Sequence, residues 1–192
     1  MGILDQINYA PVQKYDELRI GIDIGYKNFS VSIDEHKINL HLIFSSKHHF
    51  FENIHEIFLY IRDKFGNKDS KFLFYVESQH IKKNIILEYY ILGIINVLYD
   101  NKKTHQISSK IKKTIAKKIN FEYKKITSKK SFKEFITSNS TAHDFFTNGW
   151  YFVKIDYINK SVTESRSINI LMPKYDDYID SRRLLESKKK VE

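Results

Sequence analysis

The chain has 192 residues, 42% hydrophobic and 29% charged, which is typical of one globular domain and excludes a disordered chain. No apolar run reaches the roughly 18 residues of a membrane span, and the N-terminus lacks a secretory pattern, so we expect an intracellular protein. A net charge of +9 favours a polyanionic partner, and the absence of cysteine excludes disulfides and thiolate metal sites.

The first half of the chain predicts a meander of strands. We expect a loose arm over residues 1–18, which Pro11 interrupts, before a single domain over 19–187. Apolar residues then alternate with polar or small ones in three segments, 19–24, 29–33 and 38–42. A period of two with short links predicts three antiparallel strands.

Two helices and a strand are expected next. Apolar residues recur at spacings of three and four over 50–65, which predicts an amphipathic helix that Gly66 terminates. Residues 71–77 form a short apolar strand. Residues 81–99 have helical length and are apolar around almost the whole circumference. Such a helix must be covered on both sides, by the sheet and by a second subunit, which indicates a homodimer.

The second half is less regular. We expect a short strand over 105–108, lysine-rich helix and loop to about residue 139, and a strand within 150–158. A final helix over 176–186 follows Pro173, and a basic tail occupies 188–192. The predicted fold is therefore α/β, a mixed sheet with three antiparallel strands followed by alternating helices and strands.

Two carboxylates stand at the ends of predicted strands. Asp23 lies between Gly21 and Gly25 on the polar side of the first strand, although a solvated turn carboxylate would look the same. Glu77 follows five apolar or aromatic residues at the point where a buried strand emerges. A carboxylate there is costly to desolvate without a cation, although an acid in the first turn of a helix is the alternative.

Two further carboxylates share one face of the predicted last helix. Asp177 and Asp180 are three residues apart, a spacing that also suits acids favoured by a helix dipole. If this helix packs beside the first strand, the four acids could converge. Four carboxylates would then hold two Mg²⁺ ions about 3.5–4 Å apart, the arrangement that hydrolyses phosphodiesters.

Holliday-junction resolvases of the bacterial RuvC, mitochondrial and poxvirus type have three acidic motifs, which this chain resembles in order. The matching segments are Gly21-Ile-Asp-Ile-Gly25, Val76-Glu-Ser-Gln79 and Lys174-Tyr-Asp-Asp-Tyr-Ile-Asp-Ser181. The resemblance implies an RNase H-like fold, and it implies Asp23, Glu77, Asp177 and Asp180 as ligands of two Mg²⁺ ions, for which Mn²⁺ would substitute. It also implies homodimers that nick two symmetric strands of a four-way DNA junction.

The family's basic motif is matched best by two lysines, Lys129 and Lys130, ahead of a short helical segment. The resemblance implies that one of these two lysines, with Lys130 favoured, contacts the scissile phosphate or stabilises charge as the bond breaks. Lys110 and Lys113 are the alternatives. Twelve lysines and one acid lie between residues 101 and 133, and phosphate contacts are expected from this segment. The candidates for DNA binding are Lys110, Lys113, Lys124, Lys125 and Lys129.

Other readings keep part of this interpretation. The same fold could cleave RNA–DNA hybrids or flaps, and a DNA-binding protein could carry the acids without catalysis. Residues 150–167 have no counterpart in the family pattern. Richness in Lys, Ile, Asn, Tyr and Phe suggests an AT-rich genome, in keeping with a large DNA virus and the cytoplasm of its host. A mitochondrial or nuclear location is the alternative.

Overall fold

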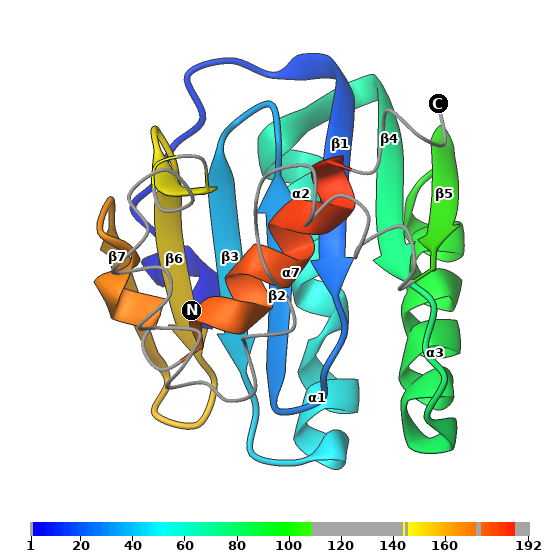
Figure 1. Cartoon of the computed structure of the whole chain (residues 1–192). Coiled ribbons are helices and arrows are strands. Elements are labelled where there is room, and N and C mark those ends of the chain that lie inside the picture. The colour runs from blue at the N-terminus through cyan, green and yellow to red at the C-terminus, as the bar shows by residue number, and fades with distance from the viewer. Residues whose placement is uncertain (1, 109–143, 145, 172–173, 187–192) are drawn as a thin grey trace.

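The computed structural model describes residues 2–108, 144, 146–171 and 174–186. Seven strands form one mixed sheet in the order β5-β4-β1-β2-β3-β6-β7 (Figure 1). The strands are β1 (Tyr15–Asp23), β2 (Asn28–Ile33), β3 (Ile38–Ile43), β4 (Gly66–Glu77), β5 (Lys102–Ile107), β6 (Tyr151–Asp156) and β7 (Ser161–Ser165). The helices are α1 (Lys47–Asn53), α2 (His55–Phe65), α3 (Lys82–Leu98) and α7 (Tyr175–Glu186), with short 3-10 turns η1 (Ile3–Gln6) and η3 (Ile168–Leu171).

Pairing within the sheet confirms the predicted meander and mixed α/β class. Strands β1, β2 and β3 pair antiparallel in chain order, and β4 then pairs parallel to β1 and β5 parallel to β4. On the other side, β6 pairs parallel to β3 and β7 antiparallel to β6. Residues 150–167, which have no counterpart in the family pattern, contain the β6–β7 hairpin. The sequence pattern predicted only the first of its two strands.

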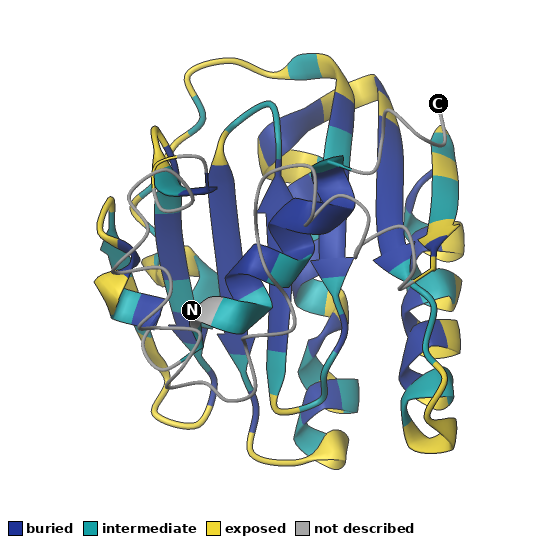
Figure 2. Ribbon diagram, in the orientation of Figure 1, coloured by how far each residue is buried: buried dark blue, intermediate teal, exposed yellow. Residues whose placement is uncertain are grey.

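The two faces of the sheet have different chemistry. On β1, Ile20 and Ile22 belong to the larger apolar core, which includes the buried side chains of α1, α2 and α3. The alternate residue Gly21 faces α7, which crosses the other side of the sheet diagonally (Figure 1). A second apolar cluster on that side combines Leu73 and Tyr75 of β4 with residues of β6, η3 and α7. The sheet is thus enclosed between two helical layers (Figure 2).

The predicted helix over 50–65 is present as two consecutive helices. The Ser46 hydroxyl caps α1 by accepting a hydrogen bond from the His49 amide at 3.2 Å. Ile54 separates α1 from α2, and α2 ends at Phe65 as the position of Gly66 predicted. Strand β4 starts directly at Gly66, five residues before the expected start, because the polar residues 67–69 still belong to the extended chain.

The N-terminal segment is not the loose arm that Pro11 suggested. The amides of Asn8 and Tyr9 donate to the Glu164 carboxylate of β7 at 2.8 and 2.9 Å. The Tyr9 ring stacks on Phe65 and lies 5.2 Å from the Tyr151 ring, between centroids. The prediction was wrong because these contacts join residues far apart in the sequence, and periodicity reports only local order.

In the part of the chain that the structure describes, helix α3 is covered on one side only. Leu87, Ile91 and Ile95 are buried against the sheet, whereas the side chains of Ile86, Tyr89 and Val97 are 61%, 67% and 77% exposed. The helix accordingly shows both buried and exposed residues along its length (Figure 2). Among the described residues, no helix is long and apolar enough to cross a membrane.

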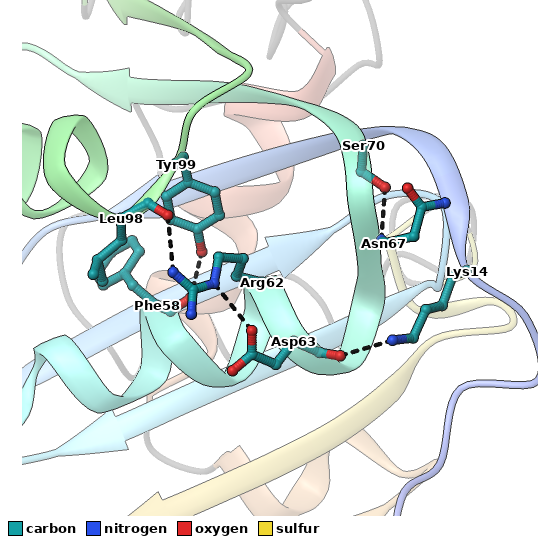
Figure 3. Close-up of polar contacts among 8 residues, drawn as sticks. All are labelled: Lys14, Phe58, Arg62, Asp63, Asn67, Ser70, Leu98 and Tyr99. Carbon is teal, nitrogen blue, oxygen red and sulfur yellow. Dashed lines mark hydrogen bonds and ion pairs between the residues drawn. The ribbon is translucent and has the colours of Figure 1, made fainter.

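A hollow of about 400 Å³ lies where α2 ends and β4 begins, and the basic side chains Lys14 and Arg62 that line it bind backbone carbonyls (Figure 3). The Lys14 ammonium donates to the Asp63 carbonyl at 2.9 Å, and Arg62 donates to the Leu98 carbonyl at 3.1 Å. These two carbonyls belong to the last turns of α2 and α3, whose ends lack intrahelical donors. This hollow is therefore a helix-capping site.

Candidate active site

Two of the predicted acids stand side by side at one edge of the sheet. Asp23 is the last residue of β1 and Glu77 is the last residue of β4. The strands are parallel, and Ile22 lies opposite Val76, so the two acids occupy the next position of the same register. Side chains alternate along a strand, so Asp23 lies on the face of Gly21, and Glu77 on the face of Tyr75. Both acids therefore project from the face that α7 covers.

Helix α7 lies directly on β1 because Gly21 has no side chain. A Cβ at Gly21 would stand 2.3 Å from the carbonyl oxygen of Ser181 and 3.1 Å from Leu185. No real Cβ approaches a backbone oxygen so closely, so any other residue here would displace the helix. The expectation that the last helix packs beside the first strand is thus met.

Hydrogen bonds rather than apolar contacts fix the middle of α7 to β2. The Ser181 hydroxyl lies 3.0 Å from the Ser30 hydroxyl and 2.7 Å from that of Ser32. The Asn39 amide of β3 donates to the same two serines at 2.9 and 3.1 Å. All four residues are fully buried. The Asn39 side-chain oxygen has no hydrogen-bond partner among the described residues, but the Asn39 NH2 group and the three hydroxyls are connected, which restricts where α7 can sit.

The acids of α7 are close to this layer. Asp177 precedes Ser181 by one turn, and Asp180 forms an ion pair with the buried Arg183. Within the described residues, no group of three or more His, Asp or Glu side chains is placed to hold one metal ion. The structure therefore brings the three acid-bearing elements together, but it does not gather their carboxylates into an ion site. The donor chemistry, carboxylate oxygen throughout, suits a hard cation such as Mg²⁺.

A buried carboxylate that the sequence analysis did not single out supports the edge near Glu77. Glu88 of α3 is 4% exposed, and it accepts hydrogen bonds from the Gln79 amide at 3.4 Å and from Gln106 at 3.2 Å. The Gln79 side chain in turn donates to the carbonyl of Glu77 at 2.7 Å. Glu88 thus ties the turn after Glu77 to β5. Its position inside an apolar segment was the available signal, because a carboxylate there requires partners.

The predicted basic residues fall outside the described part of the chain. This holds for the phosphate-contacting candidate Lys130 and for Lys110, Lys113, Lys124, Lys125 and Lys129. Their roles remain predictions.

Comparison with known proteins does not assign the chain to a family. No protein-family model matches the chain, and no curated protein matches it. Among solved structures, the yeast mitochondrial Holliday-junction resolvase overlaps 98% of this chain and 85% of its own, with 15% identity and a TM-score of 0.39. An overlap this weak does not establish a common fold, so function has to be argued from the site itself.

Proposed function

We propose that this protein is a metal-dependent endonuclease of the RNase H-like type that nicks four-way DNA junctions. The observation that carries the proposal is the meeting of β1, β4 and α7 on one face of the sheet, each with an acid of the three sequence motifs. Asp23 and Glu77 end neighbouring parallel strands, and α7 crosses β1 two residues before Asp23. A two-metal phosphodiester hydrolase needs several carboxylates near one another, and here acids far apart in the sequence lie on elements that are in contact.

The acids Asp23, Glu77, Asp177 and Asp180 would hold two Mg²⁺ ions, with Mn²⁺ as a substitute. When bound, such ions activate a water and stabilise the leaving 3′ oxygen. The Arg183 guanidinium pairs with the half-buried Asp180, so it neutralises part of the charge of this carboxylate. We propose that this pair is rearranged when ions bind.

The charge of the chain supports a nucleic acid as the substrate, and the exposed face of α3 suits a symmetric one such as a four-way junction. The chain carries a net charge of +9, and its lysines are concentrated between residues 101 and 133. Contacts to phosphates give affinity without reading base sequence, which suits recognition of shape. A symmetric junction presents two equivalent strands, and the exposed apolar stripe of α3 would join two copies of the chain for this purpose.

A nicking assay tests the proposal. Purified protein is incubated with matched four-way junction, RNA–DNA hybrid, flap and linear duplex substrates, in Mg²⁺, Mn²⁺ or chelator. We expect metal-dependent paired nicks in the junction at a rate well above that on the other three. The Asp23→Asn and Asp180→Asn variants should lose about 100-fold or more, because even outer partners of metal ligands cost about 10–100-fold.

The matched control is Asp69→Asn, since Asp69 is an exposed acid near the start of β4, at the far end of the strand from Glu77. This variant should nick at the wild-type rate. Equal rates on all substrates would favour a general nuclease, and faster cleavage of hybrids or flaps would favour the alternative substrates. Nicking that survives both motif variants, or is absent altogether, would favour a DNA-binding protein with unused acids.

A further inference from the structure

A basic pocket of about 240 Å³ lies on the same face of the sheet as Asp23, beside α7. Three lysines from separate elements line it: Lys27 before β2, Lys154 of β6 and Lys174 before α7. His41 and Asn28 form part of the wall, and none of the described residues that line the pocket is a carboxylate. Three ammonium groups that converge from different parts of the chain indicate an anion site rather than a solvated run of lysines.

The sheet register places this pocket in line with the predicted acids. Asp23 pairs with Ser30, Ser30 with His41, and His41 with Lys154. Paired residues of adjacent strands project from the same face, so these four residues form one row across the sheet. With strands about 4.8 Å apart, Lys154 lies about 14 Å from Asp23. Helix α7 passes over the middle of the row at Ser30.

Two of the three pocket lysines, Lys27 and Lys154, are within reach of a ligand. In the described part of the chain, neither Lys27 nor Lys154 forms an ion pair, and Lys27 lies 5.9 Å from the Tyr26 ring centroid. Lys27 is exposed and Lys154 is half-buried, so both side chains can reach a ligand. A cluster of like charges repels itself, and a bound anion would turn that repulsion into attraction.

His41 adds a neutral polar wall to the pocket. The ring is 1% exposed, and burial, reinforced by the charges of Lys154 and Lys174, lowers the pKa of His41 to about 3. One ring nitrogen, Nε2, lies 3.1 Å from the Asn28 side-chain oxygen. The other, Nδ1, is buried with no hydrogen-bond partner among the described residues. Because Nε2 of the neutral ring faces an oxygen, Nε2 carries the proton and Nδ1 can only accept a hydrogen bond. Nδ1 therefore suits a water molecule in the pocket, and the lysines supply the donors for an anion.

We propose that this pocket binds a backbone phosphate of the nucleic acid, a few nucleotides from the phosphate that lies at the acids. The proposal rests on the proposed function for the identity of the substrate. Nucleotides rise about 3.4 Å along a duplex strand, so a separation of about 14 Å spans a short stretch of one strand. The pocket would fix the direction and distance at which the strand passes the acids, without reading its sequence.

Salt dependence of DNA binding tests the pocket independently of cleavage. Affinity for a synthetic four-way junction is measured by fluorescence anisotropy with Ca²⁺ over a series of salt concentrations. In the double variant Lys27→Gln/Lys154→Gln, the plot of log K against log salt should become less steep by about 0.9, the value for one lost phosphate contact. The matched control is Lys64→Gln/Lys68→Gln, which removes two exposed lysines at the opposite end of the sheet and should leave the pocket's contribution intact.

Equal slopes for the two double variants, or no binding by the wild-type protein, would overturn the pocket. Inorganic phosphate gives a second readout: in an NMR titration, the amides of Asn28 and His41 should shift with a common affinity in the wild-type protein only. Shifts confined to other residues would contradict the proposal. If junctions are nicked but the salt slopes of the two double variants are equal, phosphate binding in the pocket is contradicted and the proposed function is not. If no substrate is nicked but only Lys27→Gln/Lys154→Gln has a less steep salt slope, the proposed function is contradicted and the phosphate site is not.

Discussion

At the scale of single residues, Gly21 determines how closely α7 can approach β1. In a Gly21→Ala variant, the new methyl would overlap the Ser181 carbonyl oxygen at 2.3 Å, and backbone cannot move aside as a side chain can. We expect a loss of about 1–3 kcal/mol in the free energy of unfolding, measured by urea denaturation, as for other overpacked cores.

Gly93 is the control for this substitution. A Cβ at Gly93 meets nothing within 4 Å, and the residue lies inside α3. Gly93→Ala should therefore stabilise the protein by up to about 1 kcal/mol through helix propensity. If both alanine variants behave alike at the same protein concentration, the close approach of α7 to β1 is not what the structure indicates.

His41 makes a prediction for the pH dependence of stability. Burial lowers the pKa of this histidine from 6.5 to about 3 in the folded chain, so between these values the unfolded chain binds a proton that the folded chain does not. The free energy of unfolding should then decrease as the pH falls below about 6.5, by up to about 1.4 kcal/mol per pH unit for this group.

Urea denaturation between pH 7.5 and 4.5 measures this effect. The His41→Gln variant should show a shallower decrease than the wild-type protein, because its side chain does not titrate. His55→Gln, which replaces an exposed histidine of α2, is the comparison. A wild-type pH profile that His41→Gln leaves unchanged would show that this ring is not held neutral by the fold.

At the scale of elements, the docking of α7 depends on the hydroxyl of Ser181. Ser181→Ala removes a partner from the Ser30 and Ser32 hydroxyls, which are fully buried. Leaving buried polar groups with fewer partners costs about 1–3 kcal/mol, so a loss of this size is expected in denaturation. Ser161→Ala, at an exposed position of β7, should be close to neutral. A neutral Ser181→Ala would mean that apolar contacts alone hold the helix.

The sequence predicted most elements of the fold, for a physical reason. Strands β1 to β3 bury one face in the large core, so alternation was visible, and α3 was long enough to be recognised despite its even distribution of apolar residues. Strand β7 was missed because its residues, Ser-Val-Thr-Glu-Ser, are mostly polar, as suits a short strand at the edge of a sheet. Its pairing with β6 is a tertiary property.

The candidate site was predictable only in part. Asp23 and Glu77 could be found because each is a carboxylate that ends an apolar strand. The pocket lysines Lys27, Lys154 and Lys174 could not, because they are up to 147 positions apart by their numbers and each is one lysine among many. The pairing of β2, β3 and β6 brings Lys27 and Lys154 together, and the position of α7 adds Lys174.

At the scale of the whole molecule, we predict a dimer through α3. The exposed residues Ile86, Tyr89 and Val97, with Gly93 between them, recur at helical spacing. Tyr89, Gly93 and Val97 also line a hollow of about 500 Å³. An apolar stripe of this kind on a basic, otherwise polar protein marks an interface. Sedimentation analysis should show a dimer for the wild-type protein, and a largely monomeric, still folded protein for the Ile86→Glu/Val97→Glu variant.

Val12→Glu is the control for the dimer, since Val12 is fully exposed and distant in sequence from α3. It should leave the oligomeric state unchanged. A wild-type protein that sediments as a monomer at all accessible concentrations would contradict the prediction, and it would also remove the symmetric pairing from the proposed mode of cleavage.

The buried serines and asparagine under α7 have a consequence for accuracy of position. Apolar ridges let a helix slide along its neighbour at little cost, but Ser181 can meet Ser30 and Ser32 at one axial setting only. A slip of one turn, about 5.4 Å, would separate the buried Ser30 and Ser32 hydroxyls from Ser181. These hydrogen bonds therefore fix both the axial position and the rotation of α7, so Asp177 and Asp180 occupy the same positions each time the chain folds.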